Sequence, residues 1–389
     1  MKALNPDFAG LGTTIFTVMS ALAVEHQAIN LGQGFPDEDG PIAIREEAAR
    51  VLIDGPNQYP PMMGLPALRQ AVADHDRRFY GLDYDWTREV LVTSGATEAL
   101  GAALLGILSP GDEVILFEPL YDCYLPIIRL AGAVPRLIRL QPPDWTIPMA
   151  ELAAAFNART RLILFNSPMN PTGKVFSAAE LAAIAELALA HDTYVLCDEV
   201  YEHLVFSGHC HQPIATLPGM RERTVRIGSA GKTFSLTGWK VGYLSGPAAM
   251  IGVIAKVHQF LTFTTPPNLQ AGVALGLGLG DDFYAGIAAS LEAKRDRLTA
   301  GLRAVGFRTL PVAGSYFVTA DIRGIGPDLP DDDYCQWLTR TVGVAAVPVS
   351  AFYGAAEAPR HLIRFCFCKR DEVLDAAIAR LATGLKTAA

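Results

Sequence analysis

Short apolar runs alternate with amphipathic helical patterns from about residue 90 to residue 245. The runs predict strands at 89–93, 113–117, 134–140, 161–166, 193–198, 224–228 and 241–245. Several are almost continuously apolar, as strands buried on both faces are. Between them lie helices such as the one predicted over 177–190, which opens with the capping-box pair Ser177 and Glu180. Such alternation predicts an α/β fold with a mostly parallel seven-stranded sheet flanked by helices.

The pattern changes after about residue 280, where longer helical stripes appear. One stripe consists of Ile287, Leu291, Leu298, Leu302 and Val305, and a final one of Leu374, Ile378, Leu381 and Leu385. Mixed strands and helices lie between them. Because single cores rarely grow past about 250–300 residues, we predict two domains. Residues 46–282 form the large domain, 283–389 the small α/β domain, and the N-terminal segment 1–45 joins the small one.

Composition narrows the class of ligand. The chain has 389 residues, 50% of them hydrophobic, and a net charge of −8 with acidic and basic residues interspersed. No Lys/Arg cluster favours nucleic acid or an anionic membrane, so a small-molecule ligand is expected. No run of about 20 apolar residues predicts a membrane span, and polar residues interrupt the apolar N-terminal stretch. We expect a cytoplasmic protein with buried free thiols.

Three short patterns are better explained without a ligand. His209, Cys210 and His211 are consecutive and cannot easily converge on one metal ion, so no metal is expected. Cys366 and Cys368 alternate along a strand and are expected in the core. The glycines of 276–280 lack the spacing of a dinucleotide-binding motif and indicate close helix packing.

Lys232 is the most informative residue. It lies in Gly-Ser-Ala-Gly-Lys-Thr (228–233), after an apolar strand and among small residues. A nucleotide-binding P-loop is excluded, because Arg226 stands where that motif needs glycine. Most lysines are simply solvated, but small neighbours let a bulky cofactor approach the backbone here. An apolar, cationic setting also makes a lysine nucleophilic, and Lys240 supplies a second positive charge.

These residues, with several other motifs in the same order, resemble the fold-type I pyridoxal-phosphate (PLP) enzymes. The motifs run from Asn-Leu-Gly-Gln-Gly-Phe-Pro (30–36) to Ile-Arg-Phe-Cys-Phe (363–367). More narrowly, the chain resembles the branch of kynurenine aminotransferases (glutamine transaminase K) and bacterial methionine aminotransferases. The resemblance implies that Lys232 carries PLP as a Schiff base and then shuttles the substrate α-proton.

The phosphate of PLP needs hydrogen-bond donors and positive charge. Residues 94–97 follow a strand and open a helix, where free backbone N–H groups favour an anion. The resemblance implies that Ala96, Thr97, Ser229 and Lys240 hold the phosphate. It also implies that Tyr59 reaches the phosphate of a neighbouring subunit, which predicts a homodimer with active sites at the interface.

The pyridine ring needs a carboxylate that keeps its nitrogen protonated. Asp198 ends a strand, where α/β sheets bind ligands, although such residues also cap helices. The resemblance assigns it the ring nitrogen, assigns Tyr201 and Asn170 the phenolic oxygen, and assigns Tyr121 a stacking position. Alone, Asn170 with its following proline would indicate only a turn. Tyr124 is expected to be a packing residue.

Arg364 is an isolated charge in an apolar strand. A structural ion pair would explain it, and so would the carboxylate of an amino-acid substrate. The resemblance implies the substrate carboxylate, with Gly34 and Asn170 assisting. The side-chain pocket is then expected to include Ile15, Phe16 and Phe263. All three are apolar, which favours neutral substrates such as Met, Gln, Phe or kynurenine.

Three functions follow from this reading. The first is a PLP-dependent aminotransferase that exchanges an amino group between a neutral or aromatic amino acid and a 2-oxo acid. A PLP-dependent cysteine-S-conjugate β-lyase could use the same residues, and a succinyl-diaminopimelate substrate stays open. A non-enzymatic regulator is disfavoured, because no basic DNA-binding helix precedes the domain.

Overall fold

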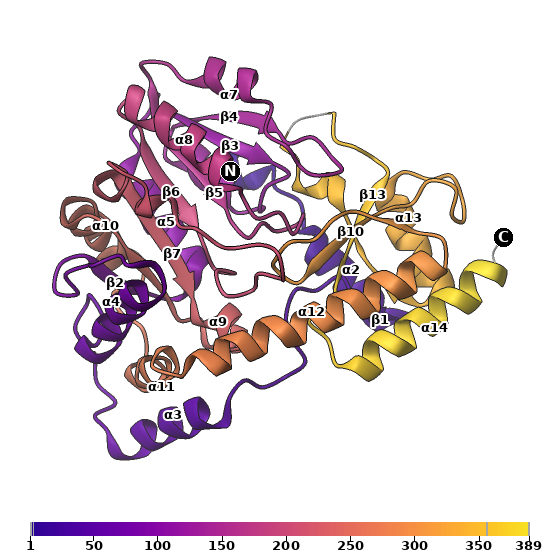
Figure 1. Cartoon of the computed structure of the whole chain (residues 1–389), viewed down its shortest axis with the longest axis horizontal. Helices are drawn as coiled ribbons and strands as arrows, with labels where there is room; N and C mark the ends of the chain where they lie inside the picture. The colour runs from indigo at the N-terminus through magenta and orange to yellow at the C-terminus, as the bar shows by residue number, and fades with distance from the viewer. Residues whose placement is uncertain (1, 3, 355–356, 388–389) are drawn as a thin grey trace.

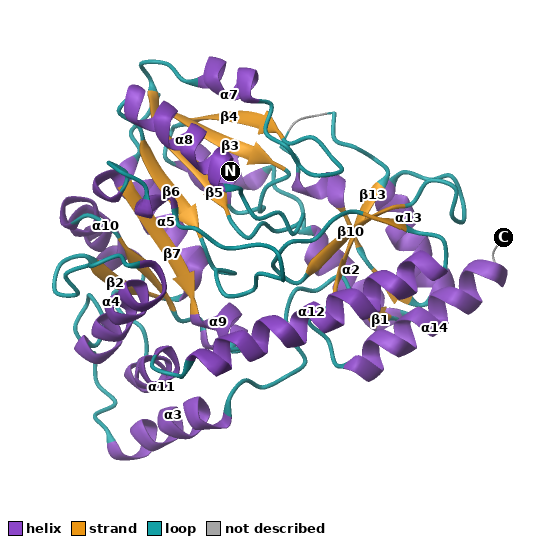
Figure 2. Ribbon diagram, viewed as in Figure 1, coloured by secondary structure: helices purple, strands orange, loops and turns teal. Residues whose placement is uncertain are grey.

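A seven-stranded sheet forms the centre of the molecule (Figure 2). The computed structural model describes residues 2, 4–354 and 357–387. The strands run in the order β2-β8-β7-β6-β5-β3-β4, and only β8 is antiparallel to its neighbours among them. Their bounds are β2 (Val90–Thr93), β3 (Glu113–Glu118), β4 (Val134–Arg139), β5 (Thr160–Asn166), β6 (Tyr194–Asp198), β7 (Thr224–Ser229) and β8 (Gly242–Ser245). The seven predicted strands are confirmed to within one residue at each end.

Helices cover both faces of this sheet because side chains of its strands alternate in direction. On β5, Leu164 packs with α5 and α10, whereas Ile163 and Phe165 pack with α7 and α8 on the opposite face. The helices of this region are α3 (Ile42–Asp54), α4 (Pro66–Tyr80), α5 (Gly95–Ile107), α6 (Tyr124–Leu130), α7 (Met149–Ala155), α8 (Ala178–Ala190), α9 (Ala230–Thr233), α10 (Ala248–Leu261) and α11 (Pro267–Leu277). Three 3₁₀ turns lie among them: η1 (Ile214–Thr216), η2 (Arg221–Arg223) and η3 (Thr237–Trp239).

Local sequence signals set individual helix ends and contacts. The Ser177 hydroxyl accepts from the backbone of Glu180, and the Glu180 carboxylate accepts from the backbone N–H of Ser177, so the predicted capping box is confirmed. The close packing expected of the glycines of 276–280 is confirmed at Gly276, where a Cβ would lie 2.6 Å from Ile44 of α3. It is wrong at Gly280, where a Cβ would meet nothing within 4 Å.

A second sheet lies towards the C-terminus. Its strands run antiparallel in the order β12-β13-β10-β9, and β1 pairs separately with β11. The elements are α1 (Pro6–Ala9), α2 (Ile15–Glu25), β1 (Ile29–Asn30), α12 (Asp281–Ala304), β9 (Arg308–Thr309), β10 (Phe317–Asp321), α13 (Asp331–Trp337), the π-helical η4 (Leu338–Val342), β11 (Val344–Ala345), β12 (Val347–Pro348), η5 (Val349–Phe352), β13 (Leu362–Cys366) and α14 (Asp371–Thr387). Both helical stripes predicted after residue 280 are confirmed as α12 and α14.

The N-terminal segment lies beside these C-terminal elements. Figure 1 shows α2 and β1 next to α13 and α14, and Ile29 of β1 is paired with Val344 of β11. The domain boundaries at residues 45 and 282 stay predictions. Within the described residues, no helix is long and apolar enough to cross a membrane.

Candidate active site

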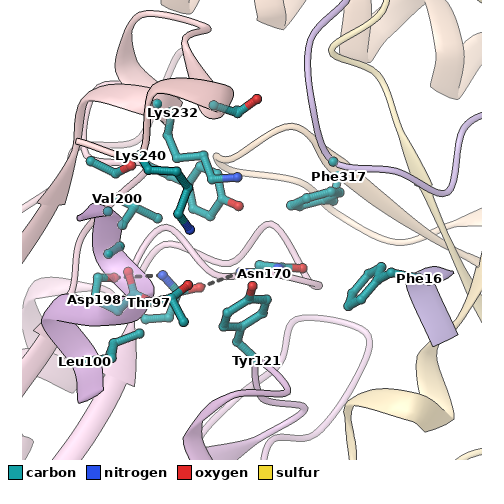
Figure 3. Close-up of a pocket in the computed structure, with 18 of the residues that line it drawn as sticks. Phe16, Thr97, Leu100, Tyr121, Asn170, Asp198, Val200, Lys232, Lys240 and Phe317 are labelled. Carbon is teal, nitrogen blue, oxygen red and sulfur yellow. Dashed lines mark hydrogen bonds between the residues drawn. The ribbon is translucent and has the colours of Figure 1, made fainter. Parts of the chain in front are cut away.

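The carboxyl ends of β5, β6 and β7 open onto a cavity of about 340 Å³ (Figure 3). All but three of the predicted site residues line it. They come from segments far apart in the sequence: Phe16, Gly34, Ala96, Thr97, Tyr121, Asn170, Asp198, Tyr201, Ser229, Lys232, Lys240 and Arg364. Ligands of open α/β sheets bind at this edge, because the loops that follow parallel strands converge there.

Lys232 enters the cavity directly after β7. The small-residue loop expected around it is a single helical turn, α9, closed by the Phe234 N–H donating to the Ala230 carbonyl. Burial lowers the pKa of the Lys232 amine, because desolvation disfavours its charged form. Its Nζ lies 5.9 Å from the ring centroids of both Tyr201 and Tyr316. The amine is therefore poised to act as a nucleophile.

Residues 95–97, at the start of α5, line the cavity and form a turn suited to binding an anion, called here the anion-binding turn. Gly95 has φ +81°, and β8 approaches the turn so closely that a Cβ on Gly242 would lie 2.6 Å from the Gly95 carbonyl carbon. A Cβ on Gly95 would in turn lie 3.4 Å from Lys240 Nζ. Figure 3 shows the Lys232 and Lys240 amines reaching into the cavity on the same side. The N-terminus of α5 and the Lys240 side chain thus face the same part of the cavity, which favours an anion there.

Asp198 ends β6 and is almost completely buried. Its Oδ2 accepts a 2.6 Å hydrogen bond from the Tyr124 hydroxyl, whereas its Oδ1 is buried without a hydrogen-bond partner in the protein. Burial raises the pKa of this carboxyl to about 6, although the Tyr124 hydrogen bond opposes the shift. An orphaned buried acceptor at the cavity wall fits a protonated ring nitrogen.

Tyr124 is the residue whose role the sequence analysis missed. It is buried, as expected of a packing residue, but its hydroxyl also holds the Asp198 carboxylate. Asn166 supports the same region. It donates to the Asp198 carbonyl over 2.7 Å and accepts from the backbone N–H of Asn170 over 2.7 Å. The two contacts to Asp198 leave no local sequence signal, because each joins segments that lie far apart in the chain.

Arg364 lies on β13 with 1% of its surface exposed. Its guanidinium donates to Asn170 Oδ1 over 2.7 Å and to the Gly32 carbonyl over 2.6 Å, and its Nε has no partner. The aromatic rings of Phe317 and Phe16 lie 4.0 and 5.3 Å from the guanidinium carbon. No carboxylate forms an ion pair with it within residues 2, 4–354 and 357–387. Burial lowers its pKa.

Three predicted residues lie away from the cavity of this chain. Tyr59 is 83% exposed, and its ring packs edge-to-face against the half-exposed Phe263, with centroids 5.3 Å apart. Ile15 begins α2 and packs against the core. Their expected roles stay predictions.

Comparison with known proteins identifies the family. Residues 26–381 match the family described as aminotransferase class I and II. The chain belongs to the class I and II aminotransferases. Members of this family use PLP, so the protein is a PLP-dependent transaminase, and its orphaned Asp198 oxygen and its anion-binding turn fit that cofactor.

Several aminotransferases of different specificity are similar to this one. The structure of the N-succinyldiaminopimelate aminotransferase of Mycobacterium tuberculosis is 48% identical, with a TM-score of 0.95 over 98% of this chain and 99% of that one. Methionine aminotransferase of Escherichia coli is 45% identical over 95% of this chain and 96% of its own length. Mouse kynurenine–oxoglutarate transaminase 3 is 41% identical over 95% of this chain and 87% of its own length. The fold is therefore that of the fold-type I aminotransferases.

Proposed function

We propose that this aminotransferase exchanges an amino group between a neutral or aromatic amino acid and a 2-oxo acid. The observation that carries the proposal is the buried guanidinium of Arg364, which has no ion-paired carboxylate among the described residues and an unpartnered Nε. A charge so buried is costly unless it is paired. The carboxylate shared by all amino acids and 2-oxo acids supplies the missing partner.

The cofactor would be held by residues on three sides of the cavity. We assign the phosphate to Ala96, Thr97, Ser229 and Lys240, the ring nitrogen to Asp198, the phenolic oxygen to Asn170 and Tyr201, the stacking position to Tyr121 and the covalent attachment to Lys232. The geometry of the anion-binding turn and the orphaned Asp198 Oδ1 support these assignments. When bound, PLP supplies the carbonyl that exchanges the amino group and an electron sink for negative charge at the substrate α-carbon.

Lys232 has a second role in this proposal. Its neutral amine would remove the proton from the substrate α-carbon and hold it at Nζ during the exchange. Burial lowers the pKa of this amine, because desolvation disfavours its charged form, and so favours the neutral, basic form. Arg364, Asn170 and Gly34 orient the substrate carboxylate, so that the α-carbon faces Lys232.

The side chain of the substrate is the finer question. Phe16, which lies against the Arg364 guanidinium, supports a neutral substrate. We also assign Ile15 and Phe263 to this pocket. The second candidate substrate is N-succinyldiaminopimelate, favoured by the 48% identity to the mycobacterial enzyme. A β-lyase reaction on cysteine conjugates begins with the same proton removal.

One spectral experiment separates these possibilities. The purified PLP enzyme is mixed with Met, Gln, Phe, kynurenine, N-succinyldiaminopimelate or a cysteine conjugate, and the cofactor absorbance is followed. We expect a neutral or aromatic amino acid to convert PLP to pyridoxamine phosphate, and a 2-oxo acid to reverse the change. Conversion by N-succinyldiaminopimelate alone would replace our substrate class with the second candidate. Irreversible release of pyruvate and ammonia from the conjugate, without transamination of any substrate, would overturn the proposal.

The attachment of PLP is tested separately. Borohydride reduction should fix the cofactor to the peptide that contains Lys232. The Lys232→Ala variant should lose this covalent label while still binding PLP non-covalently. Labelling of another lysine in the wild-type enzyme would contradict the assignment.

We further propose a homodimer in which Tyr59 completes the partner's phosphate site. The exposure of Tyr59 and of its neighbour Phe263 supports a covered surface here. Mixed dimers of Lys232→Ala and Tyr59→Ala chains should regain activity, because one site then has both Lys232 and the Tyr59 of its partner. Mixed dimers no more active than the two parents would exclude this arrangement. The six free cysteines support a cytoplasmic location.

A further inference from the structure

A buried cluster of ionisable side chains lies outside the cofactor cavity. His75 comes from α4, and Glu202 and His203 come from the turn after β6. One possible ligand atom from each lies within 4.8 Å of the others. The Nε2 atoms of His75 and His203 are 2.6 Å apart, although 128 residues separate them in the sequence. None of the three lines the cofactor cavity.

The second ring nitrogen of His75 faces a carboxylate but forms no hydrogen bond within the described residues. Its Nδ1 lies 3.6 Å from Asp76 Oδ1. Histidines that bind metals commonly direct their other ring nitrogen at a carboxylate, which fixes the tautomer and leaves Nε2 free as a ligand. The facing Nε2 of His203 could then share one proton with it, or both could bind a metal ion.

The charge of the surroundings favours a cation. Arg226 is ion-paired with Asp76, Glu199 and Glu202, at 2.5, 2.6 and 3.0 Å. All four side chains are at least 95% buried, and one guanidinium against three carboxylates leaves a charge of −2 (1 − 3). Such a buried excess is costly unless it is compensated.

We propose that His75, Glu202 and His203 bind a divalent metal ion of the zinc class. Two imidazoles and a carboxylate are ligands that Zn²⁺ accepts, with water in the fourth position. Tetrahedral ligation at about 2.0–2.1 Å needs the two ring nitrogens about 3.3 Å apart, so the rings separate by several tenths of an ångström. The ion joins α4 to the turn that follows Asp198 and Tyr201, and its role is to stabilise that turn. A related set of Glu199, Glu202 and His211 shares Glu202 with this site but offers only one imidazole.

The test is metal binding by the PLP-loaded enzyme. The protein is treated with EDTA, gel-filtered and titrated with Co²⁺, whose visible d–d absorption reports its coordination. We expect one equivalent of Co²⁺ to bind, to be displaced by Zn²⁺ and to raise Tm. His203→Asn should weaken the affinity at least about 100-fold. His75→Gln, on a different element, should do the same, and retained cofactor circular dichroism verifies folding of both variants.

Two control variants remove an exposed histidine and a buried cysteine that are not among the proposed ligands. His209→Ala removes an exposed imidazole of the nearby loop, and Cys368→Ala removes one of two buried thiols whose sulfurs lie 3.1 Å apart. Both should bind Co²⁺ like the wild type. The proposal is overturned if the wild type binds no Co²⁺, or if His203→Asn binds it equally well. A shared imidazole proton, seen by NMR at low field and unchanged by Zn²⁺, would also overturn it. These readouts do not depend on transaminase activity.

Discussion

Arg364 donates to the side-chain oxygen of Asn170 across 2.7 Å, although 194 residues separate the two. The contact fixes the guanidinium at the cavity wall, while its Nε keeps no partner in the protein. Asn170 is itself held by its backbone N–H, which donates to Asn166. The side chains of Arg364 and Asn170 are thus oriented before any substrate enters, which reduces the entropy lost on binding.

Arg364→Lys should weaken the binding of every amino-acid substrate. A lysine keeps the charge but cannot form the paired hydrogen bonds of a guanidinium. We expect kcat/KM to fall by about 100-fold, or about 3 kcal/mol, mainly through KM. Steady-state kinetics with amino acid and 2-oxo acid measure this. Arg323→Lys, on an exposed ion pair, is the control and should be unchanged. Equal kinetics for Arg364→Lys and the wild type would contradict the proposed carboxylate site.

Asp198 should make the cofactor-free protein less stable as the pH rises. Burial raises its pKa in the folded protein to about 6, whereas an aspartate in the unfolded chain titrates near about 4. Between these values the folded protein holds a proton that the unfolded chain has released, so raising the pH through this window removes stability. Asp198→Asn cannot lose that proton. Its cofactor-free form should therefore melt above the wild type at about pH 7.5.

The control for this prediction is a second pH. At about pH 4.5 the folded wild type keeps the proton on Asp198, so the difference in Tm between wild type and Asp198→Asn should shrink. A difference that is equal at both pH values would show that the ionisation of Asp198 is not its cause. With PLP present the variant should bind the cofactor more weakly, because the ring nitrogen loses its charged partner.

Tyr124→Phe should lower activity, because it removes the hydroxyl that donates to the Asp198 carboxylate. This hydrogen bond stabilises the carboxylate, so its loss raises the pKa of Asp198 further. A hydrogen bond to a charged group contributes about 1.5–3 kcal/mol, which predicts a loss of roughly 10- to 100-fold in kcat/KM near neutral pH. The acidic limb of the pH–rate profile should move to higher pH, and the loss should be smaller at alkaline pH. An equal loss of kcat/KM at every pH would show that Tyr124 acts only through packing.

Gly242→Ala should weaken cofactor binding although it removes no polar side chain. The added Cβ would lie 2.6 Å from the Gly95 carbonyl carbon and 2.8 Å from the Ala96 nitrogen, so the anion-binding turn must shift. We expect the Kd of PLP to rise at least about 10-fold, or about 1.4 kcal/mol. Fluorescence titration of the cofactor-free protein measures it. Gly252→Ala on α10, where a Cβ meets nothing within 4 Å, should bind PLP normally.

Much of this protein could be predicted from local patterns. Strands buried on both faces leave continuous apolar runs, and helices that cover a sheet leave one apolar stripe, so the seven strands and the helices α8, α12 and α14 were predicted correctly. Lys232 and Asp198, chosen from their small or apolar neighbours together with the family resemblance, both line the cavity, and their roles stay proposals. The helical turn around Lys232 was not predicted, since four residues are too short to show a period.

Only the tertiary structure decided which distant side chains meet. Tyr124, on α6, was predicted to be a packing residue because its partner Asp198 lies 74 residues away, at the end of β6. The metal site proposed at His75 and His203 left no motif, since its ligands come from α4 and from the turn after β6. The spacing of apolar residues can be recognised in the sequence, because each helix or strand buries its own face. Hydrogen bonds and ligand sets depend on where the folded elements cross, and that position is fixed by the packing of the whole core.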